Sequence, residues 1–339
     1  MSFKNDIHEN VNKSNQNNDG QNEDNNEIFS RGQEEINFKR TSPTRIRLIN
    51  DCIESGKKMP ELKKLFGQFF HQGEITVLCG DTGVGKSILA IQIAKNISEG
   101  SSNGEMIKCE SEGGSVLYFD FELGDRQFSK RYPNTKFLNN LYRVDMNPES
   151  EEFSFSTDVI SNDAKKTGTE IVIIDNISAL IMQKTSVDQE VAMNLMKGLK
   201  ELQVKENLSI LVLAHIPKIA PFEPLTINHV GGSKAITNFA DSVFFIAKSK
   251  KGTEYRYLKQ VKTRNEKEID GVVELKLTTE NGLFFESIGI TSEEEHLQEK
   301  NSKELKEKAV RLKTEGKSDS EIAKELGIDR STVFRWIKR

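Results

Sequence analysis

The sequence predicts an α/β protein with a mostly parallel central sheet, followed by a small all-α unit. Short apolar runs rich in β-branched residues alternate with segments of helical periodicity between residues 75 and 246, the pattern of βαβ units. A glycine-rich loop separates the first apolar run from the first helical segment, and residues 304–339 form a compact basic stretch of helical periodicity. These three observations define the predicted fold class.

The glycine-rich loop is the strongest functional signal in the chain. It follows a strand-forming run that starts at Ile75 and precedes a helix predicted over 86–98, and it fits G-x-x-x-x-G-K-[ST] at every specified position. Its glycines let the backbone curl so that N–H groups point at phosphates, while Lys86 adds a catalytic cation and Ser87 a magnesium ligand. The residues predicted to bind Mg-ATP or Mg-GTP are Gly80, Asp81, Thr82, Gly83, Val84, Gly85, Lys86 and Ser87. A glycine turn that binds nothing is the alternative.

Two later strands end in acidic residues. The apolar runs within 114–122 and 171–175 predict buried parallel strands, with Glu122 and Asp175 at the edge where open α/β sheets bind ligands. An acid beside the glycine loop can hold magnesium through a water molecule, so Asp175 is predicted to complete the metal site with Ser87. The alternative for Asp175 is an acid that only caps the following turn.

The other segments complete the α/β core. A strand over 208–214 ends in His215, whose imidazole can hydrogen-bond a terminal phosphate; we expect a γ-phosphate sensor, with a structural histidine as the alternative. The apolar stripe over 187–204 predicts a long helix packed on the sheet, and the proline-containing stretch 219–230 predicts a flexible loop facing the pore or substrate. Further predicted elements are helices over 45–56, 60–70 and 156–166, one after Ile236, strands over 142–144 and 242–246, and an antiparallel extension over 254–261, 272–277 and 283–285.

Composition bounds the class of protein. Residues 1–40 are dominated by Asn, Gln, Asp and Glu and predict a disordered tail, or alternatively a partner-binding arm. The net charge of −4 gives no global sign of nucleic-acid binding, so such a site must be a local patch. The three cysteines form no metal set and suit a reducing cytoplasm. The polar N-terminus has no signal peptide and the apolar runs are too short to cross a bilayer, so we expect a cytoplasmic protein without membrane contact.

The C-terminal residues 303–339 predict a DNA-binding unit, joined to the core by a charged linker over 290–302. Small Ala323, turn-forming Gly327 and the apolar residues under the second helix resemble a helix-turn-helix of the resolvase or invertase type. The residues expected to face phosphates and base edges of DNA are Arg330, Ser331, Thr332, Arg335 and Lys338, with Arg339 beside them. Trp336 is expected in the core of this unit, and a three-helix bundle for protein docking is the alternative.

Residues 60–289 resemble hexameric RecA-like ATPases, especially plasmid RepA replication helicases and the related DnaB-type helicases. The glycine loop resembles their Walker A motif, Ile174-Asp175 their Walker B motif, and Ala214-His215 their sensor. The resemblance implies a RecA-like ATPase domain over 41–289. It also implies that Glu122, on the strand after the Walker A helix, is the general base, and Asn176 after Asp175 favours this because an adjacent catalytic glutamate is missing there.

The resemblance extends to a site shared between subunits. Lys262 and Arg264 resemble the paired basic finger that reaches the γ-phosphate of the neighbouring subunit and stabilises charge during phosphoryl transfer. A finger of this kind implies a homo-oligomeric ring, expected to be a hexamer, whose isolated subunit is nearly inactive. The alternative is that both residues solvate the end of a hairpin.

These patterns lead to competing functions. The leading hypothesis is a ring-forming ATPase that uses ATP and Mg²⁺ to act on DNA, as a helicase or replication protein of a plasmid or other mobile element. The second is a DNA-binding regulator or recombination accessory protein in which ATP only switches assembly. A small-molecule kinase is a weaker hypothesis, because nothing outside the core resembles a metabolite lid and the C-terminal unit would have no role in such an enzyme.

Overall fold

The computed structural model describes residues 44–146, 149, 156–177, 188–230, 234–298 and 302–337. The chain divides into two compact units, Met1–Pro60 and Glu61–Arg339. In the first unit the described residues form helix α1 (Ile49–Lys57), which has no buried residue. This confirms a helix within the predicted span 45–56, while the tail predicted over 1–40 lies outside the described residues.

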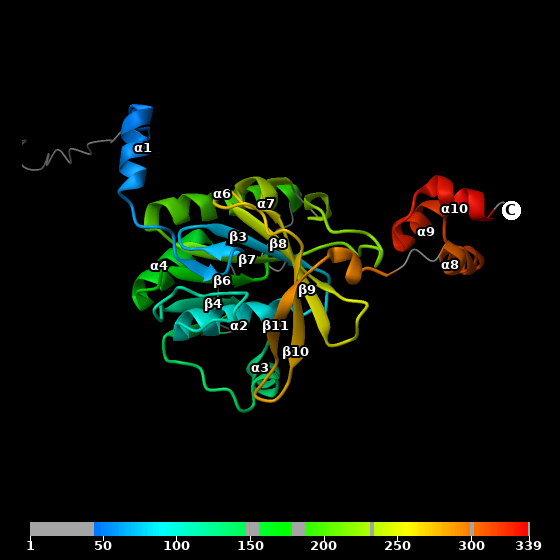
Figure 1. Ribbon diagram of the computed structural model, residues 1–339, viewed down its shortest axis with the longest axis horizontal. Coiled ribbons are helices and arrows are strands. Elements are labelled where there is room, and N and C mark those ends of the chain that lie inside the picture. Colours follow the sequence, from blue (N-terminus) through cyan, green and yellow to red (C-terminus); the bar gives the residue numbers. More distant parts are fainter. Residues whose placement is uncertain are drawn as a thin grey trace, which may run out of the picture. The chain divides into compact units, whose positions relative to one another are not determined.

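A nine-stranded sheet forms the centre of the second unit, in the order β11-β10-β9-β8-β3-β7-β6-β4-β5 (Figure 1). The strands from β8 to β5 run parallel, and β9, β10 and β11 extend the sheet antiparallel. The strands are β3 (Ile75–Gly80), β4 (Val116–Asp120), β5 (Leu141–Val144), β6 (Ile171–Asp175), β7 (Ser209–His215), β8 (Ser242–Lys248), β9 (Tyr255–Lys262), β10 (Val272–Thr278) and β11 (Phe284–Thr291). The predicted α/β class and its antiparallel extension are confirmed.

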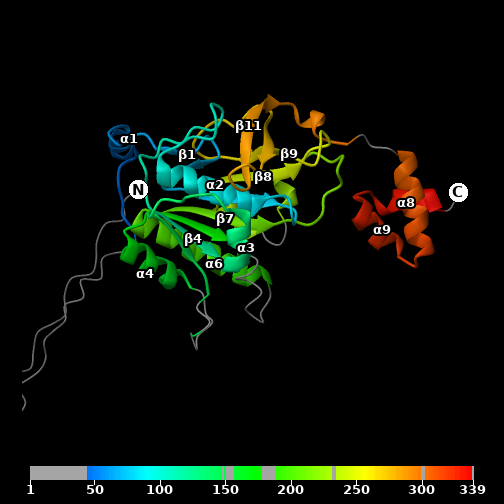
Figure 2. The same ribbon diagram turned by 90° about the horizontal axis from the view of Figure 1, so that it is seen from below.

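Helices cover both faces of this sheet. Helix α2 lies on one face, and α4 and α6 lie on the other (Figure 2). Each face has its own apolar core, one containing Leu89 and Ile93 of α2 and the other containing Met196 and Leu199 of α6. The helices of this layer structure are α2 (Lys86–Glu99), α3 (Asp125–Arg131), α4 (Thr157–Thr167), α6 (Asp188–Glu206) and α7 (Lys234–Phe239). The apolar stripe predicted over 187–204 is therefore core, as expected.

The prediction of a helix over 60–70 is wrong. The chain instead forms two short antiparallel strands, β1 (Lys64–Phe66) and β2 (Phe70–His71). Gly67 between them has φ +51°, a left-handed conformation that reverses the chain and that helices do not continue. The flanking phenylalanines are buried in the core on the α2 face, so tertiary burial rather than helical periodicity determines this segment.

The C-terminal residues form three helices, α8 (Ser302–Thr314), α9 (Asp319–Leu326) and α10 (Arg330–Ile337). They enclose a core of their own, with Leu312, Ile322 and Val333 buried in it and Trp336 packed against it. Gly327 ends α9 at φ +61°, which makes the turn predicted between the two helices. Within the described part of the chain, no helix has both the length and the apolar character needed to cross a bilayer.

Candidate active site

The glycine loop connects the buried strand β3 to helix α2. Gly83 and Gly85 take left-handed φ values of +70° and +109°, which residues with a Cβ rarely adopt. At Gly80 a Cβ would lie 2.8 Å from the carbonyl oxygen of Ile246. The loop therefore needs its glycines for both backbone conformation and space, as a phosphate cradle does.

Lys86 lies folded along this loop. Its side chain is almost fully buried, at 5% exposure, and its ammonium donates to the carbonyl oxygens of Gly80 at 2.8 Å and Asp81 at 2.9 Å. Burial lowers the pKa of Lys86, and the carboxylates of Asp175, Glu122 and Asp81 oppose that shift. A buried cation held by loop carbonyls is available for an anionic ligand such as a triphosphate.

Asp175 and Ser87 lie beside each other at the end of the parallel strands. The Asp175 side chain is buried and accepts hydrogen bonds from the Ser87 hydroxyl and from the Tyr118 hydroxyl, the latter at 2.6 Å. Carboxylate and hydroxyl oxygens next to a phosphate cradle are ligands that suit Mg²⁺. Among the described residues there is no cluster of three or more His, Cys, Asp and Glu side chains that could hold a metal ion.

Glu122, Asn176, His215 and Lys86 form one polar network. The Asn176 amide and the Glu122 carboxylate are hydrogen-bonded, and the same amide nitrogen lies 3.0 Å from His215 Nε2. His215 Nε2 is 3.3 Å from Glu122 Oε1, and His215 Nδ1 is 3.0 Å from the Lys86 ammonium. Because the Lys86 ammonium can only donate, His215 Nδ1 accepts from it. The predicted base, sensor and phosphate-binding lysine are thus brought together.

A second carboxylate holds the turn that carries Glu122. Asp120 Oδ1 accepts from the backbone N–H groups of Glu122 at 3.1 Å and Leu123 at 2.9 Å, and Asp120 Oδ2 accepts from Arg143 Nε at 2.9 Å. Sequence reasoning missed Asp120, Arg143 and the role of Asn176. Asp120 ends a strand and could have been noticed, whereas Arg143 lies in a strand with no motif around it.

Family comparison identifies the core domain. A family model described as an AAA domain matches residues 42–220, which is more than half of the chain of 339 residues. The chain belongs to the AAA domain family. A second model, described as a homeodomain-like domain, matches residues 300–339. No curated protein sequence matches this AAA domain protein.

Two solved structures are similar to this AAA domain protein. One, described as an ATPase domain, superposes with a TM-score of 0.55 at 14% identity, covering 72% of this chain and 100% of that one. A KaiC-like protein from the hyperthermophilic archaeon Pyrococcus horikoshii OT3 has a TM-score of 0.49 at 16% identity, covering 67% of this chain and 98% of that one. The core of the AAA domain protein has a RecA-like α/β fold.

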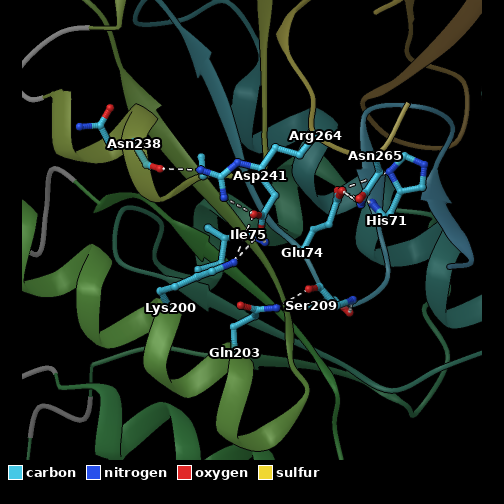
Figure 3. Close-up of polar contacts among 12 residues, drawn as sticks. His71, Glu74, Ile75, Lys200, Gln203, Ser209, Asn238, Asp241, Arg264 and Asn265 are labelled. Carbon is cyan, nitrogen blue, oxygen red and sulfur yellow. Dashed lines mark hydrogen bonds and ion pairs between the residues drawn. The ribbon is translucent and has the colours of Figure 1, made fainter. Parts of the chain in front are cut away.

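The two predicted finger residues lie at the opposite edge of the sheet from the glycine loop. Lys262 pairs in register with Val243, at the start of β8, and its ammonium donates to the carbonyl oxygens of Thr237 and Ala240. Arg264 donates to Asp241 Oδ1 at 2.9 Å, and Asp241 Oδ2 accepts from the backbone N–H of Ile75 at the start of β3 (Figure 3). The length of β3 therefore separates both residues from the loop of their own chain.

The candidate DNA-binding residues lie on one helix. Arg330, Ser331 and Arg335 of α10 are exposed, and Thr332 is half-buried, with its hydroxyl accepting from Arg335 at 3.3 Å. Lys338 and Arg339 lie outside the described residues. The chain thus carries a helix-turn-helix unit whose second helix presents two arginines to solvent.

Proposed function

We propose that this protein is a ring-forming, DNA-associated ATPase, acting as a helicase or replication protein of a plasmid or other mobile element, as RepA and DnaB-type helicases do. The observation that carries the proposal is the network of Lys86, His215, Asn176 and Glu122 beside the Ser87–Asp175 pair. It combines a phosphate-binding cation, a metal-ligand pair and a carboxylate in one place.

Each residue has a role in this proposal. The loop amides and Lys86 bind the phosphates of ATP. Ser87 and Asp175 would hold Mg²⁺, which when bound would neutralise charge on the phosphoryl oxygens. Glu122 orients and deprotonates the attacking water. His215 contacts both Lys86 and Glu122, so it is placed to register whether a γ-phosphate occupies the loop.

The ring is proposed because the finger residues cannot serve their own loop. Lys262 and Arg264 lie at the edge of the sheet where β3 starts, and the loop lies where β3 ends. A head-to-tail neighbour would bring that edge to the next subunit's loop, and such contacts form a ring when the rotation between successive subunits closes. Arg264 is half-exposed, at 49% of its side chain, and is accessible to a neighbour.

ATP turnover with and without single-stranded DNA tests the enzymatic part of the proposal. Wild-type protein is expected to hydrolyse ATP faster with DNA, and Glu122→Gln is expected to bind ATP but lose turnover. Unchanged turnover in Glu122→Gln would remove Glu122 as the base. A strand-displacement assay on forked and tailed duplexes then tests unwinding.

The helix-turn-helix favours a second candidate function. A unit that matches a homeodomain-like domain is suited to duplex DNA, which an ATP-switched regulator or recombination accessory protein would bind without separating its strands. This candidate predicts ATP hydrolysis and duplex binding with no strand displacement on any substrate. Displaced strands in the presence of ATP, absent with Glu122→Gln, would exclude it.

A further inference from the structure

Arg256 of strand β9 is a buried cation that touches the phosphate loop. Its side chain lies in the interior, at 9% exposure of the residue. Its Nε donates to the carbonyl oxygen of Val84 at 2.8 Å, and its terminal nitrogen donates to the carbonyl oxygens of Thr253 and Tyr255, each at 2.7 Å. Val84, a loop residue, is separated from Arg256 by 172 positions.

No carboxylate of the described residues forms an ion pair with Arg256. Burying an unpaired guanidinium is costly, and buried charges usually have a carboxylate partner. Arg143, by comparison, is paired with three carboxylates, those of Asp120, Asp125 and Asp145. A cation without a carboxylate partner, next to a phosphate cradle, is suited to an anionic ligand such as a nucleotide phosphate.

The bond to Val84 also fixes a peptide group. The carbonyl of Val84 and the N–H of Gly85 belong to one planar trans peptide, so they point in opposite directions. Holding the carbonyl toward β9 directs the Gly85 N–H away from β9. Gly85, at φ +109°, has no side chain to resist rotation of this peptide, and an added Cβ there would lie 2.7 Å from the ring of Phe285.

The antiparallel strands support the loop at a second point. Gln92 of α2 exchanges two hydrogen bonds with the backbone of Phe285 in β11, at 2.6 and 2.7 Å. The helix that starts at the loop and the loop itself are thus both attached to the β9–β11 extension. Arg256 supplies the attachment to the loop itself.

We propose that Arg256 is a positioning residue of the nucleotide site: it holds the Val84 carbonyl so that the Gly85 N–H points into the loop, and it adds positive charge behind the phosphates. This inference rests on the proposed nucleotide site. Loop amides contact the α- and β-phosphates, so Arg256 contributes to binding of the part that ATP and ADP share.

Nucleotide affinity of Arg256→Met tests the inference. The dissociation constants of ATP and ADP are measured by calorimetry on the full chain with Mg²⁺, together with the thermal unfolding temperature. Both constants are expected to rise about tenfold or more, and by a similar factor. Arg256→Lys keeps the charge but lacks the planar fork, so it is expected to restore only part of the affinity.

The control is Lys251→Met, which removes a cation from the same hairpin. Lys251 pairs with Glu274 and Glu295 and not with the loop, so this variant is expected to bind both nucleotides as wild type does. Unchanged affinity in folded Arg256→Met, or full recovery in Arg256→Lys, would overturn the positioning role. If Arg256→Met does not fold, Arg256→Lys alone decides, because wild-type affinity in that variant overturns the role and weakened affinity supports it.

A second variant separates this inference from the proposed function. Lys86→Ala removes the phosphate-binding ammonium itself and is expected to weaken ATP binding strongly. Loss of binding in Lys86→Ala with none in Arg256→Met would reject only the role of Arg256. Unchanged ATP binding in Lys86→Ala would reject the nucleotide site.

Discussion

Asn176 lies between the two side chains that the proposed chemistry depends on. Its amide contacts the Glu122 carboxylate and lies 3.0 Å from the His215 ring, and it is itself buried, at 2% exposure. A general base must be held within hydrogen-bond reach of the water it activates, and correct placement contributes about 10²- to 10⁴-fold. Asn176 is therefore expected to matter for turnover rather than for nucleotide binding.

Asn176→Asp tests this at nearly constant side-chain size. The change replaces a donor by a second carboxylate facing Glu122, so kcat is expected to fall about 100-fold while the Kd of ATP stays within about threefold of wild type. Steady-state ATPase rates and equilibrium binding provide the two values. Asn103→Asp, a change at another buried asparagine, is the matched control, and an equal loss of kcat there would show that the effect is structural.

Burial of the Asp175 carboxylate is expected to make the protein less stable at neutral pH when no Mg²⁺ is bound. Burial raises the pKa of Asp175 to about 6, the Glu122 and Asp120 carboxylates add to the shift, and hydrogen bonds from Ser87 and Tyr118 oppose it. Folding therefore disfavours the charged carboxylate. The resulting destabilisation is absent below the ordinary pKa of 3.8, grows between 3.8 and about 6, and is complete above that range.

Asp175→Asn removes the charge and is expected to stabilise the Mg²⁺-free protein. The difference between the ordinary pKa of 3.8 and about 6 corresponds to about 3 kcal/mol at most, so the free energy of unfolding should rise by up to that amount at about pH 8 and by much less at about pH 4. Urea unfolding with a chelator at both pH values measures this. Asp158→Asn, at an exposed position of α4, is the control. A gain independent of pH would contradict the assignment.

Among the elements, those with a strong local pattern were predictable and those set by distant partners were not. The runs that became β3, β4, β6 and β7 are continuously apolar and buried on both faces, and such runs read as strands from sequence alone. The segment 60–70 failed because Gly67 reverses the chain and packing decides the rest.

The same distinction holds for the candidate site. The glycine loop, Glu122, Asp175 and His215 follow strands in recognisable positions, so the sequence predicts them. Asn176 and Arg256 carry no motif, because what gives them a role is contact with residues 54 and 172 positions away. Only the sheet order brings those partners together.

Helix α9 has a capping arrangement whose value can be measured. The Ser318 hydroxyl accepts from the Glu321 N–H at 3.3 Å, and the Glu321 carboxylate accepts from the Ser318 N–H at 2.8 Å. Ser318→Ala is expected to reduce the stability of the C-terminal helices by about 1 kcal/mol. Amide hydrogen exchange in α9 should then accelerate about fivefold.

The control for the capping variant is Ser331→Ala, at an exposed position on α10. It is expected to leave exchange in α9 unchanged, because Ser331 is not part of this cap. Equal exchange in Ser318→Ala and wild type would mean that the cap contributes nothing to the stability of this unit.

For the whole molecule, strand β9 links two functional regions of the chain. Arg256 near its start touches the loop of the same chain, and Lys262 at its end, followed by Arg264, lies at the far edge of the sheet. A strand advances about 3.3 Å per residue, so the two ends are roughly 20 Å apart. In a ring, this strand would connect each nucleotide site with the finger that serves the next one.

Mixing two inactive variants tests whether the finger acts between subunits. Lys86→Ala destroys a chain's own loop and leaves its finger intact, whereas Arg264→Ala destroys its finger and leaves its loop intact. If fingers act on neighbouring loops, a mixed ring contains interfaces where an intact loop meets an intact finger. Each variant alone is expected to be nearly inactive, and an equimolar mixture to recover roughly a quarter of wild-type turnover, because random assembly makes about one interface in four complete.

The mixture needs a control for loss of the fold around Arg264. Arg264 bonds to Asp241, which also binds Lys200 and the start of β3, so removing the guanidinium could disturb that corner. Lys200→Met removes the other cation bound to Asp241 and leaves the finger, so it is expected to retain turnover. Loss of turnover in both Arg264→Ala and Lys200→Met, with no turnover recovered when Arg264→Ala is mixed with Lys86→Ala, would mean that Arg264 stabilises the fold of its own chain. The proposal of a site shared between subunits would then be rejected.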